Sequence, residues 1–152
     1  MLLGDVLAAN SVLNELKKSH QPLTFFLKLE KFDEIVSFIN KKKDELINQF
    51  SDGTYIYLIK DNTVIKEFKS EDEFLEFELN GDMKIDDSMV VKKVPVILNT
   101  LKRESAELDF NLLLSSDIKK YDFTVDKFTV SELKDLTLSY PSFKSLSVLI
   151  EK

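Results

Sequence analysis

A stripe of apolar residues between positions 25 and 50 is the feature that most constrains the fold of this chain. It recurs at alternating spacings of four and three residues and consists of Phe25, Leu29, Phe32, Val36, Ile39, Lys43, Leu46 and Phe50. Only Lys43 is polar, and the spacing places all eight positions on one face of an α-helix. The stripe predicts a helix from Pro22 to Phe50, roughly 43 Å long at about 1.5 Å per residue.

A shorter helix is predicted before this one. Its stripe consists of Leu2, Val6, Ala9, Leu13 and Leu16, which are again four and three residues apart. The short link between the helices predicts an antiparallel helical hairpin over residues 1–50. Because the first helix covers only about half of the second, Leu46, Ile47 and Phe50 need another cover. That cover is either a later part of the chain or another subunit.

Residues 54–68 are predicted to form a β-hairpin. "TYIYLI" and "TVIKEF" are rich in β-branched and aromatic residues, and "KDN" between them supplies a turn. Strand alternation puts Tyr55 and Tyr57 on one face, with Ile56 and Leu58 on the other. Both faces are therefore apolar, and packing against the long helix or against a partner is favoured over base stacking, which an acidic protein does not suit.

The region 70–118 is predicted to be mixed and mostly helical. Ser70 and Glu73 form a capping-box pattern that opens a short helix ending near Gly81. The linker after it contains Asp82, Asp86 and Asp87, which lack calcium-loop spacing. "VVKKVPVIL" resembles an edge strand because of Pro95. From Asn99 a helix is expected, with Leu101, Ala106, Leu108 and Leu112 facing inward.

The last region, 119–152, is predicted to be a β segment, a short helix begun by Ser131 and a closing helix begun by Ser139 and Pro141. The closing helix carries an apolar face of Phe143, Leu146, Leu149 and Ile150. Together these parts predict a single α+β domain over residues 1–152.

The composition argues against most kinds of catalysis. The chain has no cysteine, three isolated glycines, one histidine (His20) and one arginine (Arg103). These counts exclude thiolate metal sites and disfavour phosphate loops, and no nucleophile–base pair is identifiable. We therefore expect no enzyme, no cofactor and no metal site.

The charge and hydropathy patterns bear on location. The formal net charge is −6, which disfavours general nucleic-acid binding. "MLLGDVLAANS" lacks the basic start of a signal peptide, and no apolar run is long enough to span a membrane. We expect a cytosolic or virion-type protein that is not secreted by a signal peptide.

The order of parts resembles a family of small, uncharacterised proteins encoded by tailed bacteriophages and prophages. The stretches that carry the resemblance are "SVLNEL", "PLTFFLKLEKFDEIVSFINKKKDELINQFSDG", "FTVSELKDL" and "SYPSFKSLSVLIEK". The chain departs from the family pattern at residues 83–98, which look like an insertion, and in a lysine where the second helix of the family has arginine. The resemblance implies a phage context, with the chain in the virion or the host cytoplasm, and it offers no catalytic residues to carry over.

Two functions are compatible with these expectations. The first is a structural or assembly subunit of a phage particle (neck, tail or capsid-associated) that contacts other virion proteins or itself as part of an oligomer. The alternative is a non-virion phage protein that binds and redirects a host protein. In either case the candidate interface consists of Tyr55, Tyr57, Leu46, Ile47 and Phe50.

Overall fold

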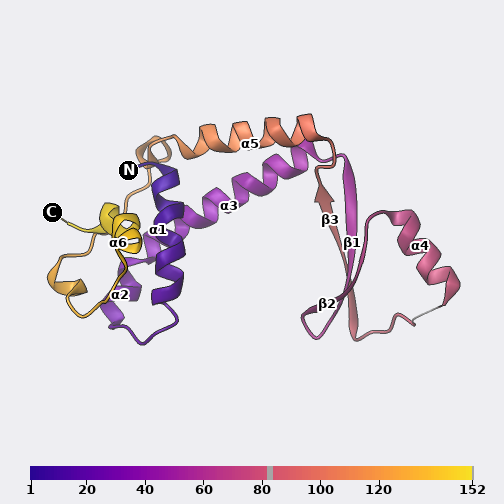
Figure 1. Cartoon of the computed structure of the whole chain (residues 1–152), viewed down its shortest axis with the longest axis horizontal. Helices are drawn as coiled ribbons and strands as arrows, with labels where there is room; N and C mark the ends of the chain where they lie inside the picture. The colour runs from indigo at the N-terminus through magenta and orange to yellow at the C-terminus, as the bar shows by residue number, and fades with distance from the viewer. Residues whose placement is uncertain (82–83, 152) are drawn as a thin grey trace. The chain divides into compact units, whose positions relative to one another are not determined.

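The structure, a computed structural model, describes residues 1–81 and 84–151, which form two compact units (Figure 1). Unit 1 consists of Met1–Lys43 and Asp109–Lys152, and unit 2 consists of Asp44–Leu108. The combination of helices and an antiparallel sheet confirms the predicted α+β class. The expected single domain stays a prediction. It would be met if the two units unfold together in one transition.

Unit 1 is helical. It contains α1 (Leu3–Leu16), α2 (Leu23–Lys28), α3 (Glu30–Phe50) up to Lys43, the end of α5 (Thr100–Leu114), α6 (Tyr140–Leu146) and the short 3₁₀ helices η1 (Ile118–Tyr121), η2 (Ser131–Leu133) and η3 (Ser147–Leu149). Its core combines α1, α2 and α3 with side chains from the last third of the chain, including Ile118, Phe128, Leu146 and Leu149.

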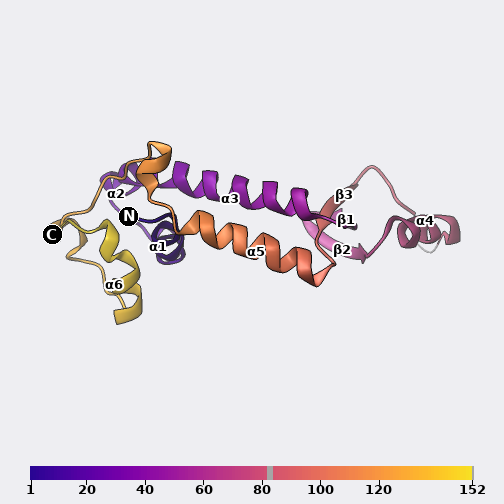
Figure 2. The same cartoon turned by 90° about the horizontal axis from the view of Figure 1, so that it is seen from above.

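Helix α1 packs against α6 and crosses α3 at a steep angle in both views (Figures 1 and 2). It therefore shares a core with α3 but does not run along it as the predicted hairpin would. Leu3 takes the inward position that was expected for Leu2, which is 41% exposed. Gly4 permits a close approach to α5, because a Cβ atom there would lie 3.2 Å from the carbonyl oxygen of Leu114.

The predicted helix from Pro22 to Phe50 is divided at Leu29. The Leu29 N–H donates to the carbonyl of Phe26 (3.1 Å), which is the tighter bond of a 3₁₀ turn, and α3 begins at the next residue. Pro22 precedes the first turn of α2 as its N-cap residue instead of lying within it. The division accompanies the stacking of Phe25 on Phe128, whose ring centroids are 5.3 Å apart.

Between Leu29 and Ile39 the inward face of α3 follows the predicted stripe except at one position. Phe32, Ile35 and Ile39 are at most 1% exposed, whereas Val36 is only half-buried. The expected burial of Leu29, Phe32 and Ile39 is confirmed, while that of Val36 is met only in part, since it packs against the core without being fully enclosed. Ile35, one residue earlier, takes the fully buried position.

Unit 2 contains a three-stranded antiparallel sheet in the order β2-β1-β3. The predicted hairpin is confirmed as β1 (Gly53–Lys60) and β2 (Thr63–Phe68), joined by Asp61 and Asn62. Both turn residues have positive φ (53° and 60°), as a two-residue type I′ turn requires. β3 (Met89–Val96) pairs along all of β1 and places Pro95 on an edge strand, as predicted.

The helix α4 (Glu71–Asn80) connects β2 toward β3 and has the predicted ends. The Ser70 hydroxyl accepts the Glu73 N–H (3.2 Å), and Gly81 caps the C-terminus with φ of 64°. Of the expected linker, Asp82 and Met83 lie outside the described residues.

Helix α5 faces inward by other residues than expected. Leu101, Leu108 and Leu112 are each at least 60% exposed, so their predicted burial is wrong. Ala106 is buried as expected, and Phe110 packs against the core of unit 1 together with Leu113 and Leu114. The inward side of α5 thus carries Ala106 and Phe110. The sequence did not indicate this side, because the exposed leucines are more apolar than alanine and were expected to face the core.

The C-terminal part matches the expectation in outline. The predicted β segment forms only an isolated parallel bridge from Phe128 to Ile150. The short helix after it is η2, and Ser131 is its first residue rather than its cap. Ser139 caps α6 as predicted, but Phe143 is 48% exposed while Leu146 and Leu149 are buried.

Candidate functional site

The sheet of unit 2 has one face that we call the open sheet face. It is defined by Tyr55, Tyr57 and Ile59 of β1 together with their direct cross-strand neighbours Val64, Glu67, Val90, Lys92 and Val94. Residues that lie directly opposite each other in a ladder point to the same side of the sheet, so these eight side chains share one side. Six of them are apolar or aromatic.

The centre of the other face of the sheet is covered by α4. Ile56 and Leu58 are at most 1% exposed and form a cluster with Phe68 and Phe77. The rings of Phe68 and Phe77 lie 5.0 Å apart. Lys93 also points to this side and pairs with Glu71 of α4 at 3.1 Å. The side chains of β1 therefore divide into a covered set and an open set.

The open sheet face is apolar and accessible. Val90 is 59% exposed and Val64 is 52% exposed, and Tyr55 and Tyr57 are half-buried between them and their other strand neighbours. Antiparallel sheets with one solvated face normally alternate apolar and polar residues, but β1 is apolar on both faces. An exposed apolar patch of this kind is typical of an interaction surface.

Two opposite charges flank the centre of this face. Tyr57 lies directly opposite Glu67 on β2 and directly opposite Lys92 on β3, so the charges stand on either side of its ring. With neighbouring strands about 4.8 Å apart, the two positions are separated by roughly 9.6 Å. Both residues are exposed, and neither forms an ion pair within the part of the chain that the structure describes.

The carboxylate of Asp52 connects the end of β3 to the start of β1. It accepts the backbone N–H groups of Leu98 (2.5 Å) and Asn99 (2.8 Å). These hydrogen bonds, the one from Leu98 first, together with the charge of Lys102, lower the pKa of Asp52. No local signal in the sequence reveals this role of Asp52, because its partners lie 46 and 47 residues away.

The predicted interface residues fall into two groups. Tyr55 and Tyr57 lie together on the open sheet face, whereas Leu46, Ile47 and Phe50 are half-buried on the last turns of α3. In both views the start of α5 runs alongside this part of α3 (Figures 1 and 2). Ile59, Val64, Glu67, Val90, Lys92 and Val94 were not predicted, because only the strand register reveals that they share a face with the tyrosines.

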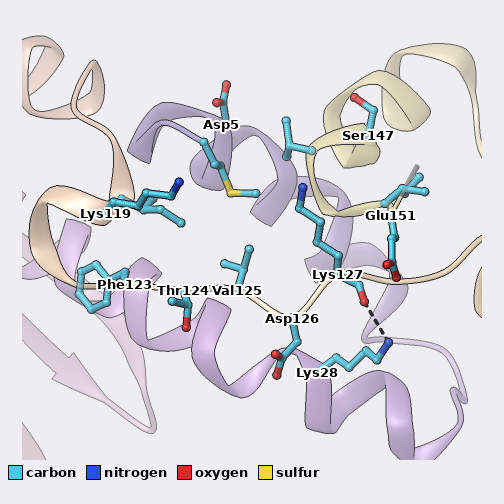
Figure 3. A pocket seen from close by; sticks show the side chains of 14 residues that line it. Asp5, Lys28, Lys119, Phe123, Thr124, Val125, Asp126, Lys127, Ser147 and Glu151 are labelled. Atoms are coloured by element: carbon cyan, nitrogen blue, oxygen red, sulfur yellow. Dashed lines mark hydrogen bonds between the residues drawn. The ribbon is translucent and has the colours of Figure 1, made fainter.

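Unit 1 contains a broad open groove of about 1220 Å³ (Figure 3). Several of its polar groups bond to other groups of the same chain. The ammonium of Lys28 donates to the carbonyl of Lys127 (2.9 Å) and to Glu132 (2.6 Å), Asp126 pairs with Lys31 (3.6 Å), and Ser147 donates to the carbonyl of Lys144 (2.7 Å). Among the described residues that line it, the groove thus shows no nucleophile held by a base.

The Lys28–Glu132 pair is the strongest electrostatic feature beside this groove. The hydrogen bond from Lys28, followed by those from the N–H and hydroxyl of Thr129, lowers the pKa of Glu132 to about 2. The Glu132 N–H in turn donates to the Thr129 hydroxyl, so the two residues form a reciprocal cap. The sequence "TVSE" has the spacing of such a cap, with Thr129 as the cap residue, although Ser131 was the one expected.

Two further observations concern the described residues as a whole. Within residues 1–81 and 84–151, no group of three His, Cys, Asp or Glu side chains is placed to hold a metal ion, and His20 is exposed between α1 and α2. No helix in these ranges combines the length and apolar character needed to cross a bilayer.

Comparisons with protein-family models, with curated proteins and with solved structures give no match to this chain.

Proposed function

We propose that this chain is a non-enzymatic structural or assembly protein that acts through protein–protein contact. The open sheet face carries the proposal, because it exposes valines and tyrosines on a rigid sheet whose other face is already filled. Tyrosine is enriched at the centres of interfaces, where its ring buries a large area at a small cost in conformational entropy.

The groove of unit 1 favours a structural role as well. Lys28 bonds to Lys127 and Asp126 pairs with Lys31, so the groove joins segments that are distant in sequence, and Ser147 bonds locally to Lys144. Catalysis needs a polar group that is free to act on a substrate, and the groups just named are engaged.

The setting we propose is a phage particle, with the chain as a neck, tail or capsid-associated subunit. This setting rests on the resemblance of "PLTFFLKLEKFDEIVSFINKKKDELINQFSDG" and "SYPSFKSLSVLIEK" to the phage family. A non-virion protein that binds a host protein is the second candidate, and the net charge of −6 favours it where the host target is basic.

Mass spectrometry of purified particles, from cells that supply the chain and its variants, tests this proposal. We expect wild-type chain in the particles and a strong loss of the Tyr55→Ala/Tyr57→Ala double variant. Leu79→Ser is the matched control, because Leu79 is an apolar residue of α4 that is 87% exposed and lies off the open sheet face. Absence of the wild-type chain from particles would favour the host-directed alternative, and normal incorporation of the double variant would contradict the role of this face.

A further inference from the structure

We propose that the open sheet face binds a second copy of this chain, in a two-fold dimer whose axis runs parallel to β1. The inference rests on the proposed function, since it names the partner of the same face. It commits to one occupant and to one orientation, and both follow from the positions of the charged and apolar residues on the sheet.

The charges on the face have opposite signs on opposite sides of the central strand. Lys92 lies on β3 and Glu67 lies on β2, at the same level along the strands as Tyr57 of β1. Neither has an ion-pair partner among the described residues, while Lys93, the next residue of β3, is paired with α4 on the covered face. On the open sheet face, the two charges without an ion-pair partner thus lie on the two lateral strands.

Only two simple two-fold arrangements place this face against its own copy. If the axis runs across the strands, Lys92 meets Lys92 of the second copy, and Glu67 meets Glu67. If the axis runs along β1, the two lateral strands exchange places, so that each Lys92 meets Glu67 of the other copy. The second arrangement forms two opposite-charge contacts, whereas the first forms two like-charge contacts, which disfavour association.

The apolar residues agree with the same orientation. Ile59 lies opposite Val64 on β2 and opposite Val90 on β3. An axis along β1 therefore places Val90 against Val64 of the second copy, one level away from the Lys92–Glu67 contact, and Tyr57 against its own equivalent. Such an arrangement is the aligned packing of two sheets, which lie about 10 Å apart and interdigitate their side chains.

Charge reversal tests the dimer and its orientation together. The molecular mass in solution is measured by light scattering after size-exclusion chromatography over a range of concentrations. We expect the wild-type chain to form dimers. Lys92→Glu and Glu67→Lys should each raise the dimer Kd at least about tenfold, because each substitution creates two like-charge contacts.

An equimolar mixture of the two variants should recover association as heterodimers. In such a heterodimer the carboxylate introduced at position 92 of one copy meets the ammonium introduced at position 67 of the other. The second contact joins the unchanged Glu67 of the first copy to the unchanged Lys92 of the second. Both contacts therefore pair opposite charges again, so recovery in the mixture tests the pairing of charges across the dimer. The orientation is tested by the single variants, because with the axis across the strands the wild type would already form two like-charge contacts and neither reversal would weaken association.

The matched control is Lys93→Glu, which makes the same charge change on the same strand but on the covered face. It removes an exposed ion pair with Glu71, a contact of small energetic value, and should leave the dimer intact. Circular dichroism melting of every variant checks that the fold is retained, and the recovery of dimer in the mixture does so independently.

Three results would overturn the inference: a wild-type monomer at all concentrations, dimers that both charge reversals leave unchanged, or a mixture that fails to recover association. The proposed function is judged separately by the particle experiment. A monomeric chain that still enters particles through Tyr55 and Tyr57 would refute the dimer and leave the structural role standing.

Discussion

At the scale of single residues, Glu132 shows how a surface carboxylate can contribute to stability that depends on pH. It bonds Lys28 at 2.6 Å and Thr129 at 3.0 Å, and its pKa falls from 4.5 to about 2. A group whose pKa is lower in the folded state stabilises the fold above its unfolded pKa, and this contribution is lost as the pH falls through the folded value.

We therefore predict that the urea midpoint of the wild-type protein falls between about pH 4.5 and pH 2 more steeply than that of Glu132→Gln. Glu78→Gln, on α4, serves as the control and should follow the wild-type curve. Parallel curves for the wild type and Glu132→Gln would show that Lys28 and Thr129 do not bind the charged form preferentially.

The buried Ile35 gives a second prediction at this scale. Ile35 is 0% exposed in the core of unit 1, whereas its neighbour Val36 is half-buried. Ile35→Ala should cost about 2–5 kcal/mol in the free energy of unfolding, because it leaves a cavity. Val36→Ala should cost clearly less, as measured by urea unfolding. Equal costs for the two variants would indicate that Val36 is buried as deeply as Ile35, as the sequence predicted.

At the scale of elements, the C-terminal cap of α4 depends on backbone conformation alone. Gly81 has φ of 64°, and a Cβ atom there would meet no atom within 4 Å. Gly81→Ala should therefore lower stability by about 1–2 kcal/mol through left-handed strain, and Gly81→Asn by less, because asparagine tolerates this conformation. If thermal unfolding gave alanine and asparagine the same effect, left-handed strain would not be the cause.

The elements also show which parts of the fold a sequence can reveal. The hairpin and the caps at Ser70, Gly81 and Ser139 were predictable because their signals are local. The division at Leu29 has no proline or glycine to mark it, and it accompanies the contact of Phe25 with Phe128, about a hundred residues away. A contact over that distance leaves no local signal in the sequence. The choice of Ile35 over Val36 as the fully buried residue likewise depends on the packing of unit 1.

The candidate site was predictable only in part for a related reason. Alternation in "TYIYLI" placed Tyr55 and Tyr57 on one face, but β1 is apolar on both faces, so the sequence did not show which face α4 covers. The charges at Glu67 and Lys92 join the site only through the register of three strands. The pairing of β3 with β1 spans a long sequence distance and leaves no local signal, and the irregularity in the β1–β2 ladder hides the register of Glu67.

At the scale of the whole molecule, the two units share continuous helices. α3 (Glu30–Phe50) passes from unit 1 to unit 2 after Lys43, and α5 (Thr100–Leu114) passes from unit 2 to unit 1 after Leu108. Helix formation is cooperative, because each added residue uses hydrogen bonds to turns that already exist. Loss of one unit therefore removes support for the helical turns that enter the other.

We predict from this that both units unfold in one transition, as the single-domain expectation requires. Amide hydrogen exchange measured by mass spectrometry at increasing urea should show α1 of unit 1 and β1 of unit 2 losing protection at the same concentration. Asp109→Pro breaks α5 at the boundary, where an interior proline costs about 3 kcal/mol, and should separate the two transitions. If the wild-type sheet lost protection while α1 stayed protected, the units would be independent domains, and the dimer face would then belong to a part of the chain that folds by itself.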